Sequence, residues 1–294
     1  MSNKVVIVTG SNAGIGKAIA TQVIARDEPI TLLATSRQGV DFGLTPNHPK
    51  SKVEYPKLDV TSDSSIAALL KLVKERFDGR VDVVILNAGG GHWFEDAANS
   101  TFGPEAAVKS LDLNYYATSR MMDAFLPHMH GGRLVFVTSG VSWQVKFDNK
   151  ALYDRAFSPT LDRSELDQMV KEYIESTKTP EQQGTGWLHN GYMPIYSTGK
   201  AFSNLLVAVE AKGHPDVLIS AACPGVVNSD GLPKTMPWKY KTPEQGSQLP
   251  LRCAFGDIGG VSGKYWTGTT TASLGPGVVV DDWAGKDIIW DNEV

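Results

Sequence analysis

Cysteine and long apolar runs are both scarce in this chain of 294 residues. The two cysteines, Cys223 and Cys253, show no metal-ligand spacing, and two are too few for a disulfide framework. We therefore expect a protein of the reducing cytoplasm. No apolar stretch approaches the roughly 18 residues that a membrane span needs. The strand-like KVVIVTG begins at Lys4, so we also expect no cleavable signal peptide.

A strong excess of either charge is missing as well. Basic residues number 28 and acidic residues 32, which gives a formal net charge of −4 at pH 7. Such a surface has no general attraction for a phosphate backbone or for anionic lipid, so neither nucleic acid nor membrane is expected as a partner. The 41% of hydrophobic residues is enough for a sizeable core.

What the chain does have is a regular alternation of short apolar runs with segments of helical periodicity. The runs typical of buried parallel strands are VVIVTG (5–10), ITLLATS (30–36), VDVVILNAG (81–89), RLVFVTSG (133–140) and VLISAACPG (217–225), with a weaker candidate at 53–60. Helices are expected at 14–26, 62–76, 104–129 and 196–212, the second with Thr61 or Ser62 as its N-cap.

This alternation predicts an α/β fold with a single doubly wound parallel sheet, Rossmann-like, and helices on both faces. No repeat or linker marks a second domain, so residues 1–294 are expected to form one domain. Residues 141–195 break the rhythm. Within them Leu166, Met169, Val170 and Tyr173 fall at i, i+3, i+4 and i+7, and Ser164 could cap a helix there. We expect a helical insertion that lies on the sheet domain.

A glycine-rich turn, Thr9-Gly10-Ser11-Asn12-Ala13-Gly14-Ile15-Gly16, follows the first strand and opens the first helix. Glycines at such a place let a pyrophosphate approach the free N–H groups of a helix N-terminus. The alternative is a turn whose glycines serve packing only. A nucleoside-triphosphate loop needs glycine, four further residues and then Gly-Lys-Ser or Gly-Lys-Thr. This chain has Ser11 in place of the first glycine and Ala18 in place of the final serine or threonine, so such a loop is excluded.

The helix expected at 196–212 begins with Tyr196 and Lys200, four positions apart and therefore on one face. An ammonium beside a phenol stabilises the phenolate, so we expect Lys200 to lower the pKa of Tyr196 toward neutrality. A tyrosine and a lysine at this spacing are also common on helix surfaces. Other polar residues follow the predicted strands, where ligands of open α/β sheets bind.

The spacing T-G-x-x-x-G-x-G, Asn87-Ala88-Gly89, Ser139, Tyr196-x-x-x-Lys200 and Cys223-Pro224-Gly225 together resemble the short-chain dehydrogenase/reductase superfamily. The long separation of Ser139 from Tyr196, with its helix from Arg163 to Gly186 and Trp187, resembles the monomeric carbonyl reductase branch. The segment 242–255 followed by GKYWTG is similar to that branch too. The resemblance implies hydride transfer with a nicotinamide cofactor in a monomer.

By this resemblance Tyr196 is the acid, Lys200 tunes it and binds the nicotinamide ribose, Ser139 binds the substrate oxygen, and Asn114 holds a water that passes protons to Lys200. The resemblance also implies the cofactor-binding residues Gly10, Ser11, Asn12, Gly14, Ile15, Gly16, Ser36, Arg37, Asp59, Val60, Asn87, Ala88, Gly89, Tyr196, Lys200, Pro224, Gly225 and Val227. Where the family often has a threonine after the last of these, either Asn228 or Ser229 could substitute.

The second strand ends in Thr35-Ser36-Arg37 without an acidic residue, which favours NADPH/NADP+ because arginine pairs with a 2′-phosphate. Against this, Ala13 stands where many NADPH-using relatives carry a basic residue. Arg37 could also be a solvated surface charge. Asp59 contacts the adenine by resemblance, although an aspartate at a strand end can equally be a turn residue.

Aromatic residues near the predicted site indicate a bulky apolar substrate, such as an aromatic ketone, an aldehyde or a quinone. They are Trp143, Trp187, Tyr192, Trp93 and Trp238, together with Met193. Alternatively, these rings merely anchor the insertion. The histidines at 92, 128, 130 and 189 form no metal-ligand pattern, and no metal is expected.

The resulting hypothesis is a cytoplasmic, monomeric, NADPH-dependent carbonyl reductase that acts on a small-molecule carbonyl substrate. One alternative is an NAD-dependent alcohol dehydrogenase working in the oxidative direction. Another is a non-catalytic cofactor-binding sensor, although such proteins often lose the tyrosine or the lysine, and this chain keeps both.

Overall fold

The computed structural model describes residues 2–90, 103–145, 149–179, 187, 193–229, 238–281 and 283–284. Within these ranges one eight-stranded sheet has the order β3-β2-β1-β4-β5-β6-β7-β8. Its strands are β1 (Lys4–Val8), β2 (Ile30–Ala34), β3 (Lys52–Glu54), β4 (Val83–Leu86), β5 (Arg133–Val137), β6 (Leu218–Ala222), β7 (Lys264–Thr267) and β8 (Val278–Val280). Neighbouring strands pair in parallel except β8, which is antiparallel to β7.

The direction of winding reverses between β1 and β4. From β1 the chain moves outward to β2 and β3, then returns to the other side of β1 to form β4, β5 and β6. Loops that leave the carboxyl ends of β1 and β4 therefore separate to opposite faces and open a crevice, where ligands of doubly wound sheets bind.

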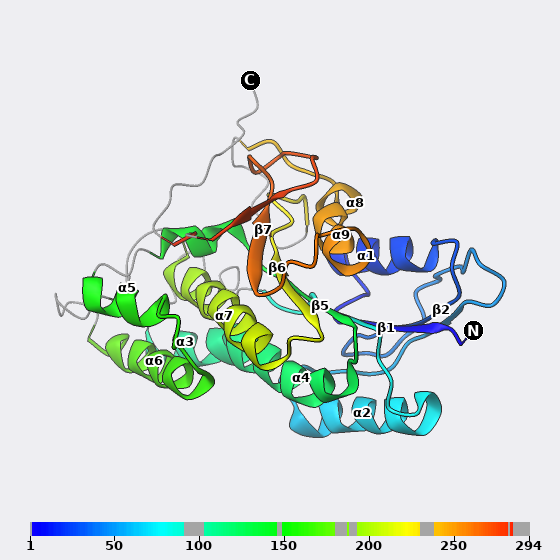
Figure 1. The fold of residues 1–294 in the computed structure, drawn as a ribbon, viewed down its shortest axis with the longest axis horizontal. Coiled ribbons are helices and arrows are strands. Elements are labelled where there is room, and N and C mark those ends of the chain that lie inside the picture. Colours follow the sequence, from blue (N-terminus) through cyan, green and yellow to red (C-terminus); the bar gives the residue numbers. More distant parts are fainter. Residues whose placement is uncertain are drawn as a thin grey trace.

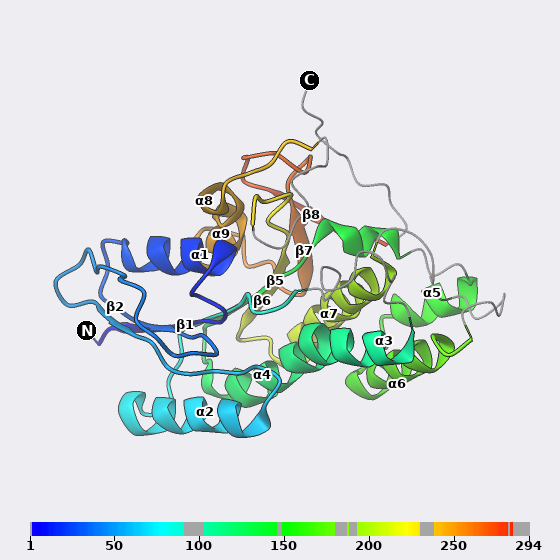
Figure 2. The ribbon, with the colours of Figure 1, turned by 180° about the vertical axis from the view of Figure 1, so that it is seen from behind.

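Helices cover both faces of this sheet, with α1, α8 and α9 on one face and α2, α3, α4 and α7 on the other (Figures 1 and 2). They are α1 (Gly14–Ile24), α2 (Asp63–Phe77), α3 (Pro104–Leu111), α4 (Ala117–Phe125), α5 (Lys150–Ala156), α6 (Arg163–Ser176), α7 (Pro194–Gly213), α8 (Pro243–Gly246) and α9 (Gln248–Phe255). The π turn η1 (Asp112–Tyr116) joins α3 to α4, the 3₁₀ turn η2 (Leu126–His128) continues α4, and a second 3₁₀ turn, η3 (Gly140–Gln144), follows β5. The predicted doubly wound fold is confirmed.

The predicted elements agree with the observed ones in place and type, and the differences are local. Ser62 caps α2 as expected, its hydroxyl accepting from the N–H of Ser65 at 3.3 Å. The cap of α6 is Asp162 and not Ser164, with its carboxylate accepting from the N–H of Glu165 at 2.9 Å. A carboxylate at a helix N-terminus also faces the positive end of the helix dipole. The last two strands, β7 and β8, were not predicted as strands.

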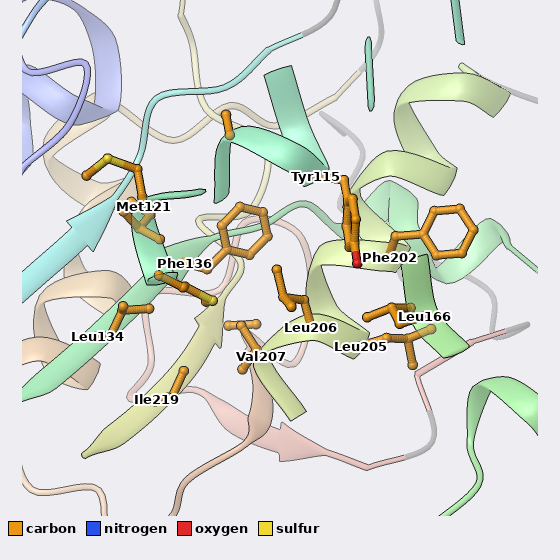
Figure 3. Packing of buried hydrophobic residues seen from close by; sticks show 14 of the residues in the cluster. Tyr115, Met121, Leu134, Phe136, Leu166, Phe202, Leu205, Leu206, Val207 and Ile219 are labelled. Atoms are coloured by element: carbon orange, nitrogen blue, oxygen red, sulfur yellow. The ribbon is translucent and has the colours of Figure 1, made fainter. Parts of the chain in front are cut away.

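The insertion packs on the outside of α7 and α3, as Figure 3 shows for Leu166 beside Leu205 and Phe202. The four positions predicted to form its apolar stripe, Leu166, Met169, Val170 and Tyr173, are all fully buried. The prediction of an amphipathic helix lying on the sheet domain is confirmed.

Polar contacts also tie the insertion to the sheet domain. Arg163 at the start of α6 pairs with Glu210 of α7 at 2.6 Å and with Asp123 of α4 at 3.3 Å. Among the helices in the described ranges, none combines the length and the apolar character that crossing a membrane requires.

Candidate active site

The glycine turn joins the end of β1 to the start of α1. Gly10 and Gly14 have φ of 65° and 51°, in the left-handed region that favours glycine. A Cβ on Gly16 would lie 2.1 Å from the carbonyl oxygen of Gly10 and 2.4 Å from Nδ2 of Asn87, so no side chain fits there. The N-cap residue Ala13 supplies no side-chain cap to α1, which leaves the first N–H groups of the helix for an anion.

Asn87, the residue after β4, stabilises this turn through hydrogen bonds. Its Nδ2 donates to the carbonyl oxygens of Thr9 at 3.0 Å and Gly10 at 3.2 Å. In return the hydroxyl of Thr9 accepts from the N–H groups of Asn87 at 3.0 Å and Ala88 at 2.9 Å. Asn87 was expected to contact the cofactor; the structure also makes it the support of the turn. The part played by the Thr9 hydroxyl was not predicted.

Two hollows adjoin at the carboxyl ends of the strands and share Gly10, Ala88 and Gly89 in their walls. The first, of about 410 Å³, is also lined by Gly14, Ile15, Gly16, Asn87, Ser139, Tyr196, Lys200, Pro224, Gly225 and Val227 among the predicted site residues. The second, of about 520 Å³, is lined by Asn12, Ser36, Arg37, Asp59 and Val60. Together they form one groove, which we call the cofactor groove, across the point where the strand order reverses.

Two predicted site residues do not line either hollow. Ser11 is fully buried beneath the turn, where its hydroxyl donates to the carbonyl oxygen of Val8 at 2.7 Å. Its side chain therefore supports the turn, and the predicted contact of Ser11 with the cofactor stays a prediction. Asn114 is buried as well, one layer behind the groove.

Tyr196, Lys200 and Ser139 meet at one end of the cofactor groove. Tyr196 and Lys200 come from the first turns of α7, and Ser139 follows β5. Tyr196 and Ser139 line the same hollow, and the nearby side chain of Ser139 acts to lower the pKa of Tyr196. The ammonium nitrogen of Lys200 lies 5.7 Å from the ring centroid of Tyr196 and donates to the carbonyl oxygen of Val137 at 3.1 Å.

Burial governs the protonation of this pair. Removal from water raises the pKa of Tyr196 well above its usual value, although the nearby side chain of Ser139 acts in the opposite direction. The same burial lowers the pKa of Lys200 to about 7. The expectation that Lys200 lowers the pKa of Tyr196 is therefore wrong for the protein without a bound ligand. Burial disfavours the charged form of both groups, so the pKa of Tyr196 rises. At neutral pH the phenol keeps its proton.

Asn114 lies in the π turn η1, which interrupts the long helix expected at 104–129. Its side-chain Nδ2 donates to the carbonyl oxygen of Gly90 at 2.8 Å. Its backbone carbonyl oxygen accepts from the hydroxyls of Thr118 at 2.8 Å and Ser203 at 2.7 Å. A Cβ on Gly89 would lie 3.2 Å from both Asn114 Oδ1 and Lys200 Nζ, so Gly89 is the spacer between these two side chains. The proposed water relay through Asn114 stays a prediction.

The other end of the cofactor groove holds Arg37 and Asp59. Oδ1 of Asp59 accepts from the hydroxyl of Thr61 at 2.7 Å and from its N–H at 2.9 Å. These bonds, and then the charge of Arg37, hold the pKa of the Asp59 carboxyl below its usual value. Asp59 is therefore a turn residue that also lines the groove, and its two interpretations are compatible. The exposed Arg37 lines the same hollow.

The aromatic residues divide between the two roles considered for them. Trp238 and Met193 line the hollow that contains Tyr196, together with Val141, which was not predicted. Trp187 instead packs between Tyr173 and Phe202, with ring centroids 5.6 Å and 5.7 Å away, so it anchors the insertion.

Trp143 lines a small adjoining cavity and packs against Tyr265. Of the two candidates for the family's threonine, Ser229 lines the groove. Trp93, Tyr192, His92 and His189 lie outside the described residues.

Comparison with known proteins identifies the class. The family model described as short chain dehydrogenase matches residues 4–155, more than half of the chain, and the chain belongs to this family of oxidoreductases. Short-chain dehydrogenase/reductase 1 of Saponaria officinalis is 27% identical over 290 residues, which cover 89% of this chain and 93% of that protein. Carbonyl reductase [NADPH] 1 of Bos taurus is 29% identical over 282 residues, with 90% and 96% covered.

Solved structures agree in fold. Menthone neomenthol reductase from Mentha piperita has a TM-score of 0.68 at 23% identity and covers 91% of this chain and 99% of its own. Salutaridine reductase from Papaver somniferum has a TM-score of 0.69 at 21% identity, with 90% and 99% covered. At these identities the likeness concerns the fold.

The cofactor groove fits the nicotinamide dinucleotides that this family uses. Its middle is a glycine turn where a Cβ on Gly14 would meet nothing closer than Ser229 at 3.8 Å, so a phosphate could approach the backbone. One end offers a cation at Arg37, and the other offers the tyrosine, lysine and serine.

The first prediction concerns the glycine turn. Gly16→Ala forces a Cβ against Gly10 and Asn87, which opens the turn, and we expect it to weaken dinucleotide binding at least about tenfold, or about 1.4 kcal/mol. Calorimetric titration with NADPH and NADH measures this. Gly213→Ala is the matched control, because a Cβ there meets nothing within 4 Å. Unchanged affinity of Gly16→Ala would contradict the role given to the turn.

The second prediction concerns pH and Lys200. Between about pH 7 and pH 10 the folded protein has released the Lys200 proton that the unfolded chain still binds, so this group makes the protein more stable as pH rises. Urea unfolding of wild type and Lys200→Met across this range tests it. We expect the difference in unfolding free energy, wild type minus variant, to increase with pH; a constant or falling difference would show that Lys200 keeps its charge when buried.

Proposed function

We propose that the protein reduces a ketone or an aldehyde to an alcohol with NADPH. The observation that carries the proposal is the convergence of Tyr196, Ser139 and Lys200 on one hollow at one end of the cofactor groove. Two hydroxyls that converge from different elements can hold one substrate oxygen between them. Bound NADPH would supply the hydride for the carbonyl carbon.

The residues of the groove supply the proton and its placement. As the carbonyl oxygen gains negative charge, Ser139 donates a hydrogen bond to it and Tyr196 transfers its phenolic proton, which completes the alcohol. The raised pKa of Tyr196 suits this direction, because the group must arrive protonated. Lys200, with its pKa brought to about 7, can carry positive charge beside the phenolate that remains and stabilise it.

The residues that would hold the cofactor follow the groove. The turn from Gly10 to Gly16 would bind the pyrophosphate, and the segment of Pro224 and Gly225 would lie along the nicotinamide. Arg37 would pair with the 2′-phosphate, which distinguishes NADPH from NADH. In support, bovine carbonyl reductase [NADPH] 1 and human carbonyl reductase [NADPH] 3 are relatives at 29% and 28% identity.

A bulky apolar carbonyl compound is the proposed substrate class. Trp238, Met193 and Val141 make an uncharged wall beside Tyr196, and aromatic and thioether side chains accommodate flat apolar molecules. We also propose a single domain that acts as a cytoplasmic monomer. In support of the monomer, the insertion helix α6 already covers the outer side of α7.

The third prediction tests the acid. Tyr196→Phe removes the proton donor and should lower the rate of NADPH oxidation with an aromatic ketone about 10²- to 10⁴-fold. Tyr173→Phe is the matched control, since Tyr173 is buried in the insertion, away from the residues that line the groove. Turnover by Tyr196→Phe equal to that of the wild type would refute the mechanism.

The fourth prediction tests the cofactor. Arg37→Ala should raise the KM for NADPH by roughly tenfold or more, as expected when a charged hydrogen bond of about 1.5–3 kcal/mol is lost, and leave the KM for NADH unchanged. Arg76→Ala, which removes an arginine paired with Glu54, is the control. Equal effects on both cofactors would favour the NAD-dependent alcohol dehydrogenase instead.

A further inference from the structure

A third polar residue shares the face of α7 that carries Tyr196 and Lys200. Asn204 follows Lys200 by four positions, just as Lys200 follows Tyr196, so the three side chains form one stripe along the helix. Each meets a different residue where β5 ends. Tyr196 meets Ser139, Lys200 meets the carbonyl oxygen of Val137, and Asn204 meets Thr138.

The amide of Asn204 bridges two points of the turn that contains Ser139. Its Oδ1 accepts from the hydroxyl of Thr138 at 2.6 Å, and its Nδ2 donates to the hydroxyl oxygen of Ser142 at 3.0 Å. Ser142 in turn donates its own proton to the carbonyl oxygen of Ser139 at 2.8 Å. These bonds fix the orientation of the Asn204 amide. The hydroxyl of Ser142 already donates its proton to Ser139, so it can only accept from Asn204, and Nδ2 must face it.

The whole chain of bonds is buried and its members are satisfied. Asn204 is 4% exposed, Thr138 3% and Ser142 not at all. In so apolar a setting each of these bonds is strong and a broken one is costly, so the network holds a single arrangement. Asn204 does not line the cofactor groove, whereas Thr138 and Ser139 do. It therefore reaches the site only through the residues it holds.

We infer that Asn204 is a positioning residue for Ser139: it clamps the turn from Thr138 to Ser142 onto α7, so that the serine and tyrosine hydroxyls converge on one substrate oxygen. The inference rests on the proposed function. An amide suits the place because it accepts from Thr138 and donates to Ser142 at once; aspartate lacks the donor and leucine lacks both.

The fifth prediction follows from this clamp. Asn204→Ala should lower kcat on the order of 10- to 100-fold, the effect of a small misplacement of a reacting group, and leave the KM for NADPH within about twofold. Leu205→Ala is the control for a general loss of packing on the same helix, since Leu205 faces the insertion core (Figure 3). It should lower the melting temperature and leave kcat unchanged where the protein is folded.

A double-mutant cycle with Ser139→Ala separates the possible outcomes. If Asn204 acts through Ser139, Asn204→Ala causes no further loss in the Ser139→Ala background. Losses that multiply, or a wild-type kcat for Asn204→Ala alone, would overturn the inference. Should Asn204→Ala fail to fold, Ser142→Ala breaks the same clamp from its other side and is subject to the same criteria. Full turnover by Ser139→Ala would instead refute the proposed mechanism itself.

Discussion

The site depends on the contact between one face of α7 and the carboxyl end of β5. A helix presents a stripe of side chains every 3.6 residues, and a parallel strand ends in a turn whose backbone groups need partners. Here the stripe of Tyr196, Lys200 and Asn204 lies against that turn: Lys200 donates to the carbonyl oxygen of Val137, Asn204 accepts from the hydroxyl of Thr138, and Tyr196 lies near the side chain of Ser139. Because this contact is buried, the polar groups that would do the chemistry are also the ones that hold helix and strand together.

Burial sets the electrostatic character of this site. It raises the pKa of the phenol and lowers that of the ammonium, so both groups are drawn toward their neutral forms. The sequence predicts a charged Lys200 that lowers the pKa of Tyr196, and the buried pair does not behave in this way. The phenol of Tyr196 therefore keeps its proton, and Lys200 can take up positive charge when negative charge develops beside it.

Much of the fold and many of the site residues could be predicted from the sequence, because their signals are local. Continuous valine and isoleucine runs predict buried parallel strands, and the glycine turn and the tyrosine–lysine spacing each span only a few residues. The last two strands, β7 and β8, were missed because three or four residues carry too little periodicity. The burial of Ser11 could not be predicted, nor could the choice between the two interpretations of Trp187, since both depend on which distant residues pack against them. The sign of the Tyr196 shift was wrong for a similar reason: spacing shows proximity but not dehydration.

The π turn η1 interrupts what would otherwise be one continuous helix and separates α3 from α4. Each residue of an α-helix advances the direction of its side chain by roughly 100°, so the additional residue accommodated in a π turn rephases everything beyond it. Upstream, α3 places Lys109 at the end of the groove that holds Arg37; downstream, α4 directs Met121, Met122 and Phe125 into the core beneath the sheet. The irregularity thus gives a single segment two orientations, one toward the groove and one toward the core.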